Sequence, residues 1–159
     1  MAISPNDDFT AGQVLTSTEA NQWPRGVMAT ASSTTNYVLT TSTVIATGMT
    51  VTFTAVASRN YRITYYEPQI TTPSILSGST DTTIRVTNAA GTQLQKSVFQ
   101  TGAASQIAGS TTNTYVGTLT AGSITIVGCA VTSSTTGAPQ LTRGATFPAQ
   151  LTVEDIGTA

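Results

Sequence analysis

Threonine alternates with apolar residues in the segment MTVTFTAV, and this period of two constrains the fold more than any other feature of the chain. In an extended strand, successive side chains point to opposite faces of the sheet. Threonine is β-branched and favours strands, and its hydroxyl keeps the outer face hydrated without adding charge. The segment therefore predicts a strand with Met49, Val51, Phe53 and Ala55 facing inward and Thr50, Thr52 and Thr54 facing outward.

The same alternation recurs from Gly26 to the end of the chain. Further strands are predicted at 26–32, 60–67, 84–87, 93–99, 115–119, 123–131 and 147–157. Two pairs of these segments are joined by short Gly-containing turns, so they are predicted hairpins with antiparallel strands. About eight strands with regular turn signals predict an all-β, antiparallel jelly-roll sandwich. The alternative, an immunoglobulin-like sandwich, would show a Cys…Trp…Cys pattern, which is absent.

The composition favours a surface that packs against copies of itself. The 159 residues suit one domain, only 8% of them are charged, and about a third are Ser or Thr. Few charges mean few groups that repel each other or need partners when two copies meet. The alternative is a secreted, O-glycosylated chain, but the Thr residues alternate with apolar residues and do not run with Pro.

The absence of histidine is the strongest limit on the catalytic and metal-binding chemistry that this sequence can support. Without it the chain has neither the commonest general base nor the commonest metal ligand, so we expect no enzyme, no cofactor and no metal. The net charge is −1 and the basic residues are scattered, so we expect no nucleic-acid partner. Those residues are Arg25, Arg59, Arg62, Arg85, Lys96 and Arg143.

Targeting signals are also missing from the sequence. The N-terminus MAISPNDDFTAG has neither a basic region nor an apolar core of the Sec type, so we expect synthesis in a cytoplasm without export by that route. No apolar run approaches the roughly 20 residues of a membrane span, so we expect no membrane insertion.

The stretch GQVLTSTEANQWPRG differs from the rest, because it predicts a short helix. Thr16 and Glu19 fit a capping box, and Pro24 disfavours the helical conformation at Trp23, so the helix should span about 17–22. A helix this short needs a packing surface to persist. We interpret residues 1–26 as a docking anchor and 27–159 as the sandwich domain; the alternative is that the helix plugs the open end of the sandwich.

The predicted docking contacts within the anchor are its apolar residues, the capping acid and the Trp-Pro-Arg run. Trp and Arg are the residues most often found as interface hot spots. The predicted docking residues are Phe9, Leu15, Glu19, Trp23, Pro24 and Arg25.

Four tyrosines in the strands are candidates for a trimer interface or a glycan contact, because aromatic faces stack on sugar rings. They are Tyr61, Tyr65, Tyr66 and Tyr115. The alternative is packing in the core or at a subunit interface. Two predicted loops, Gln69–Ser79 and Gly102–Thr112, would contact a host glycan or a neighbouring protein.

The remaining candidates favour structural roles. Glu154 and Asp155 form an acidic pair, but neighbours on a strand point to opposite faces and cannot easily share one calcium ion. Cys129 lies in an apolar strand, where it should be a small buried side chain rather than a nucleophile. As the single cysteine, it can form no intrachain disulfide.

The N-terminal sequence DDFTAGQVLTSTEANQWPRGVMA resembles that of small structural proteins of tailed bacteriophages, especially phages of actinobacteria. The shared phrase is F-x-x-G-x-x-L-T-x-x-x-x-N followed by P-R-G. Here it comprises Phe9, Gly12, Leu15, Thr16, Asn21, Pro24, Arg25 and Gly26. The segments NYRITYYEP and TRGATFPAQLTVEDIG are similar to that group as well.

The resemblance implies a virion component: a minor tail or tail-tip accessory protein, or a capsid head fibre or decoration protein. The β-domain resembles tumour-necrosis-factor-like jelly rolls, which implies a homotrimer, although fold does not fix function. The implied partners are other virion proteins and a host cell-surface glycan, since three sites on one trimer gain avidity on a repetitive surface. The alternative function, from a different class, is a free-standing carbohydrate-binding module.

Overall fold

The computed structural model describes residues 17–72, 78–101, 107–133 and 139–159. One short helix, α1 (Ser17–Gln22), precedes the strands, as the capping pattern and Pro24 predict. The strands are β1 (Gly26–Ser33), β2 (Tyr37–Val38), β3 (Ile45–Ala55), β4 (Arg59–Thr72), β5 (Gly78–Val86), β6 (Gln93–Thr101), β7 (Ile107–Thr118), β8 (Gly122–Thr132), β9 (Gln140–Leu141) and β10 (Ala149–Thr158).

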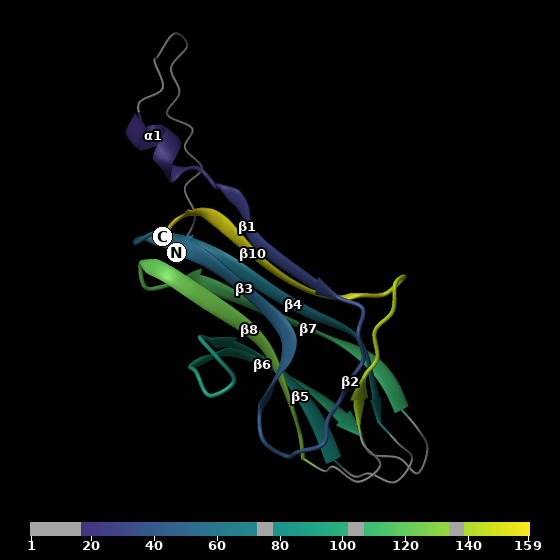
Figure 1. Ribbon diagram of the computed structural model, residues 1–159. Coiled ribbons are helices and arrows are strands. Elements are labelled where there is room, and N and C mark those ends of the chain that lie inside the picture. The colour runs from purple at the N-terminus through teal and green to yellow at the C-terminus, as the bar shows by residue number, and fades with distance from the viewer. Residues whose placement is uncertain (1–16, 73–77, 102–106, 134–138) are drawn as a thin grey trace.

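The strands form two antiparallel sheets that pack face to face, so the predicted sandwich is confirmed (Figure 1). In sheet A the long strands have the order β1-β10-β4-β7. The short strand β9 pairs with Ile70 and Thr71 near the C-terminal end of β4, and β2 pairs with β9. Sheet B has the order β3-β8-β5-β6. Most successive long strands cross between the sheets, which is a jelly-roll arrangement. The first predicted hairpin is confirmed, because β5 and β6 pair within sheet B. The second predicted hairpin was wrong: β7 pairs with β4 in sheet A and β8 pairs with β3 and β5 in sheet B, so the short turn between them crosses from one layer to the other.

The core lies between the sheets and comes from the inward positions of the alternating strands. Its larger cluster joins Met49, Val51 and Phe53 of β3 to Tyr61, Ile63 and Tyr65 of β4, and to Ile84, Ile126, Leu151 and Val153. A fully buried aliphatic or aromatic side chain contributes about 1.5–3 kcal/mol through removal from water. The assignment of Met49, Val51, Phe53 and Ala55 to the inner face is confirmed, since all four are buried.

Several strands are longer than the alternation predicts, and this corrects the two loops proposed as contact surfaces. Residues 69–72 of the Gln69–Ser79 segment belong to β4, and β5 already begins at Gly78. Residues 107–112 of the Gly102–Thr112 segment belong to β7. The Ser, Thr and Gly residues of both stretches favour turns. Pairing of β7 with β4, and of β5 with β6, outweighs that local preference. Residues 73–77 and 102–106 lie outside the described residues.

Candidate functional site

Helix α1 lies beyond one end of the two sheets, close to the start of β1 and the end of β10 (Figure 1). Its last turn is held by Arg59, the first residue of β4. The Arg59 guanidinium donates from Nη1 to the carbonyl of Asn21 and from Nη2 to the carbonyl of Trp23. Carbonyls at a helix C-terminus lack intrahelical partners and carry partial negative charge, so a guanidinium is well suited to them.

Arg59 is itself fixed by Asp155 of β10. The two side chains form a bidentate ion pair, with Arg59 Nε bonded to Asp155 Oδ2 and Nη2 bonded to Oδ1 at 2.7 Å. Both residues are buried. Gly157 of β10 lies near the end of α1, since a Cβ added at Gly157 would be 3.3 Å from the carbonyl oxygen of Gln22. We call this arrangement of Asn21, Trp23, Arg59 and Asp155 the anchor joint.

The anchor joint lowers the pKa of the Asp155 carboxyl. Burial alone raises this pKa, but hydrogen bonds from Arg59 and from the amide of Gly157, together with the charge of Arg59, outweigh burial. The pKa of Arg59 is raised, mainly by its hydrogen bond to Asp155 and against the opposing effect of burial. Both shifts keep the pair charged at neutral pH.

A pH dependence of stability follows from the lowered pKa of Asp155. The unfolded chain takes up a proton near the ordinary value of 3.8, whereas the folded carboxylate stays ionised to lower pH. The stability from the pair is therefore complete above pH 3.8 and is lost as the pH falls from 3.8 through the lower folded pKa. Urea unfolding measured from pH 6 to pH 2.5 should show a smaller loss for Asp155→Asn in that window; superimposable pH profiles would contradict this assignment.

The predicted docking residues that the structure describes lie at the surface of this end. Trp23 keeps 46% of its surface exposed, so it is not enclosed by its own sandwich, and Pro24 and Arg25 are exposed as well. Glu19 lies in α1, but its side chain falls outside the described residues, and so do Phe9 and Leu15. Trp23, Pro24 and Arg25 therefore form one exposed run, whereas the capping-box contacts lie outside the described residues.

A cavity of about 330 Å³ lies beside the anchor joint. It opens between the end of α1, the β3–β4 turn and the last residues of β10. Its lining includes Asn21, Arg25, Val56, Ser58, Arg59 and Thr158. The turn is tightly shaped, since Ser58 has a positive φ of 57° and its carbonyl accepts a hydrogen bond from the amide of Ala159 at 2.9 Å.

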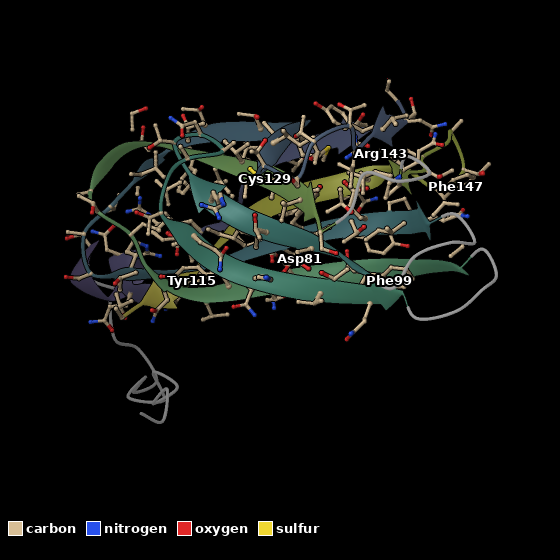
Figure 2. All side chains as sticks on the ribbon, turned by 90° about the horizontal axis from the view of Figure 1, so that it is seen from below. Asp81, Phe99, Tyr115, Cys129, Arg143 and Phe147 are labelled. Atoms are coloured by element: carbon tan, nitrogen blue, oxygen red, sulfur yellow. The ribbon has the colours of Figure 1, made fainter. Side chains whose placement is uncertain are left out.

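Three of the four candidate tyrosines turn toward the interior. Tyr61 and Tyr65 are fully buried in the core of their own chain, so neither can stack on a sugar or contact a second subunit. Tyr115 packs against the same core, and its hydroxyl donates to the carbonyl of Thr118 at 3.2 Å. Only Tyr66 lies on the outer face of sheet A, partly exposed. The interpretation as core packing therefore holds for three of them, with Tyr115 near one end of the sandwich (Figure 2).

The outer face of sheet A is built from three straight rows of side chains. Each row crosses β1, β10, β4 and β7 in register. The rows are Ser32–Gln150–Tyr66–Thr112, Thr30–Thr152–Thr64–Thr114 and Val27–Glu154–Arg62–Val116. We call these twelve residues the threonine face. Its two charges form an ion pair, Arg62 Nε to Glu154 Oε2 at 2.6 Å, so the face has no net charge.

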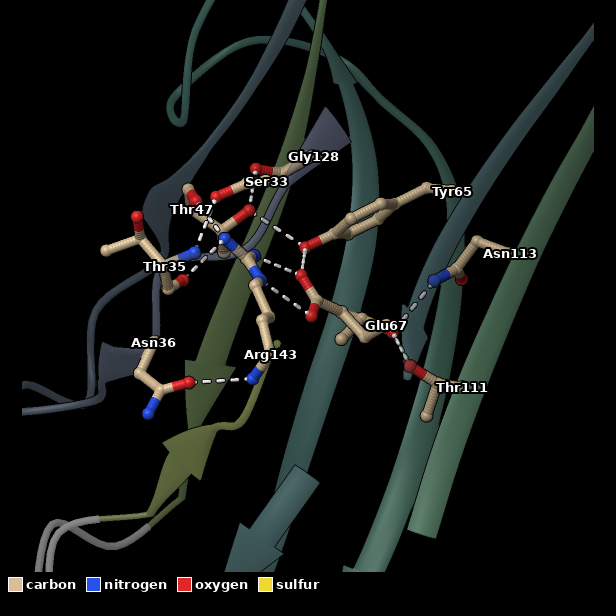
Figure 3. Close-up of polar contacts among 11 residues, drawn as sticks. Ser33, Thr35, Asn36, Thr47, Tyr65, Glu67, Thr111, Asn113, Gly128 and Arg143 are labelled. Carbon is tan, nitrogen blue, oxygen red and sulfur yellow. Dashed lines mark hydrogen bonds and ion pairs between the residues drawn. The ribbon is translucent and has the colours of Figure 1, made fainter. Parts of the chain in front are cut away.

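A second buried ion pair, which the sequence did not suggest, lies within the sandwich (Figure 3). Arg143, just after β9, binds Glu67 of β4 through two bonds, Nε to Oε2 at 3.1 Å and Nη2 to Oε1. Their side chains are 1% and 0% exposed. The Arg143 Nη1 atom also donates to the carbonyl of Thr47 at 3.0 Å, and its backbone amide donates to Asn36 Oδ1 at 2.7 Å.

Tyr65 completes this polar cluster. Its hydroxyl donates to Glu67 Oε1 and accepts from the Thr47 hydroxyl at 2.8 Å. The carbonyl of Gly128, also 2.8 Å from Thr47 Oγ1, is the alternative acceptor for that one hydrogen. Burial, followed by the charge of Glu67, raises the pKa of Tyr65 well above its usual value. Because the groups bond one another and the ion pair is buried, we interpret the cluster as structural.

The other candidate groups offer no reactive site. Glu154 and Asp155 point to opposite faces, toward Arg62 and Arg59 respectively, as argued from strand geometry. Burial raises the pKa of the Cys129 thiol to about 11, a poor state for a nucleophile. Among the residues that the structure describes, no group of three or more Asp, Glu or Cys side chains could hold a metal ion. Within the same residues, no helix is long and apolar enough to cross a membrane.

Comparison with known proteins adds no relative. No family model matches the chain. No curated protein matches it either. The site is therefore interpreted from its own geometry.

Proposed function

We propose that this chain is a structural protein of a bacteriophage virion. In this proposal residues 1–26 dock on the particle, and the jelly roll is displayed outward as a homotrimer. The position would be that of a minor tail or tail-tip accessory protein, or of a capsid fibre or decoration protein. The displayed domain would attach to a host surface or brace a neighbouring virion protein.

The observation that carries the proposal is the anchor joint. A six-residue helix is marginal alone, yet α1 is fixed at its C-terminus by a buried ion pair drawn from two different strands. Trp23, in the same segment, remains 46% exposed. A helix that only plugged the sandwich would turn its large apolar side chain inward. A rigidly held helix with an exposed Trp instead supports docking on another protein.

The decisive experiment removes the anchor. We expect a chain lacking residues 1–23 to keep its sandwich fold but to be lost from purified particles, with at least a tenfold drop in copy number by quantitative mass spectrometry. Circular dichroism of the isolated truncated chain serves as the folding control. Normal incorporation of a folded truncated chain would refute the docking function.

The threonine face supports self-association. Its side chains are short and mostly uncharged, its one ion pair is internally neutral, and Val27 and Val116 are each 58% exposed at its edge. A face without net charge can pack against a copy without burying an unpaired charge. We propose this face, with Tyr66 within it, as the contact between subunits of the trimer.

A lysine placed in the middle of the threonine face tests that assignment. Thr64→Lys puts an unpaired charge into each proposed contact, so we expect the molar mass in light scattering to fall from trimer to monomer at micromolar concentration. The matched control is Thr52→Lys, an exposed outward position on sheet B whose mass should stay that of a trimer. A wild-type monomer, or equal behaviour of the two variants, would contradict the contact.

The partial exposure of Tyr66 favours one alternative function, a carbohydrate-binding module. Tyr66 lies beside Gln150 and Thr112, which supply an amide and a hydroxyl next to its ring. A glycan array would show binding by the isolated domain and its loss in Tyr66→Ala. Binding without any association with particles would favour this alternative over the virion role.

A further inference from the structure

The cavity beside the anchor joint is distinctive because of its charge. Its lining residues include two arginines, Arg25 and Arg59, and no acidic residue among the described part of the chain. Because Arg59 is already paired with Asp155, the net positive charge at the cavity comes from Arg25. A positive charge at the wall of a concave site attracts an anion to that site.

The two arginines differ in what they can still bind. Arg59 is buried and occupied by Asp155 and by the carbonyls of Asn21 and Trp23. Arg25 is exposed, and its side chain forms no ion pair with any residue that the structure describes. The Arg25 guanidinium is therefore the cation that a ligand in the cavity can reach.

The other lining groups define the ligand further. The Ser58 hydroxyl and the Asn21 amide are polar groups able to donate to an oxygen, and Val56 offers an apolar wall that is 37% exposed. A guanidinium binds a carboxylate through two parallel hydrogen bonds, a geometry that a single ammonium cannot reproduce. This combination fits a carboxylate carried on a short apolar stem.

We propose that the cavity receives a Glu or Asp side chain of the protein on which the anchor docks, with Arg25 as its binding partner. The inference rests on the proposed docking function and names the chemistry of the partner. Trp23, in the same exposed segment, contacts the partner beside the cavity, so one apolar and one charge-assisted contact together fix the docked orientation.

Particle incorporation tests the proposal with a matched pair of variants. We expect Arg25→Glu to lower the copy number on purified particles at least tenfold, because the cavity then repels the partner carboxylate. Thr52→Glu places a new carboxylate on the outer face of sheet B, away from both the cavity and the threonine face, and should leave docking of each chain unchanged. Normal incorporation of Arg25→Glu, while the chain lacking residues 1–23 is lost, would overturn the carboxylate site but leave the docking function intact.

A direct binding measurement uses the full chain and a defined probe. Amide and Arg side-chain NMR signals of ¹⁵N-labelled protein are followed during titration with the α-amide of N-acetylglutamate, whose only carboxylate is that of the side chain. The neutral α-amide of N-acetylglutamine is the control at equal ionic strength. We expect saturable shifts at Ser58 and Thr158 with the acid only, lost in Arg25→Gln and retained in Arg62→Gln. Equal responses to both probes would overturn the proposal. Saturation that emerges only in an Asp7→Asn, Asp8→Asn variant would assign the cavity to the chain's own N-terminal acids and overturn it too.

Discussion

Glu67→Ala is expected to lower the free energy of unfolding by about 3–5 kcal/mol, the usual cost of removing one partner of a buried ion pair. The variant leaves the Arg143 guanidinium in the interior with no carboxylate, and it removes the acceptor of the Tyr65 hydroxyl. The lost contacts involve β3, β4 and the segment after β9 at once. Urea unfolding at pH 7 and fixed protein concentration measures the change, because self-association would shift apparent stability.

Two comparison variants keep this prediction refutable. Glu154→Ala truncates a carboxylate of the same kind, but its partner Arg62 is half exposed in the single chain, so we expect a far smaller change at a protein concentration too low for self-association. The double variant Arg143→Met, Glu67→Leu removes both charges and should recover more than half of the loss. A loss under about 1 kcal/mol for Glu67→Ala would mean that the pair is effectively solvated.

Arg59→Met should cause the second largest loss in the free energy of unfolding, and it should also loosen the contacts that hold α1. The variant leaves Asp155 buried without its cation and releases the carbonyls of Asn21 and Trp23. Because this pair lies at the end of the sandwich, we expect the low end of the range for a broken buried pair, about 3 kcal/mol. Loss of the contacts to α1 should also speed tryptic cleavage after Arg25 by at least tenfold.

The matched control is Arg62→Met, which removes the same side chain from an exposed pair elsewhere on β4. Its rate of cleavage after Arg25 should equal that of the wild type. If Arg59→Met destabilises the chain without changing this cleavage rate, the pair supports the sandwich and does not hold the helix.

The sandwich could be predicted from the sequence because its signal is local and repeated. Inward and outward residues alternate through β3 and β10, and burial follows that pattern residue by residue. The short strands β2 and β9 could not be predicted, since two residues carry no periodicity. The true lengths of β4 and β7 also escaped prediction, because pairing between distant segments decides them.

The site was only partly predictable, and the reason is again one of distance along the chain. The short helix that ends before Pro24 and the exposed Trp23 follow from local sequence. The partners of Arg59 and Glu67 do not, since 96 residues separate Arg59 from Asp155 and 76 separate Glu67 from Arg143. In the sequence these residues are a few scattered charges. Only 8% of the residues are charged, and five of the charged residues that the structure describes are buried: Arg59, Glu67, Asp81, Arg143 and Asp155. The scarcity of charged residues was the one signal that the sequence offered for their structural roles.

The anchor joint determines how mechanical load enters the domain. A pull on α1 would act directly on β1, which is an edge strand of sheet A and would unzip one hydrogen bond after another. The contacts of Arg59 and Asp155 instead transmit tension to β4 and β10, two interior strands of sheet A. Force applied through α1 is thereby shared among three strands that must move together, rather than acting on β1 alone.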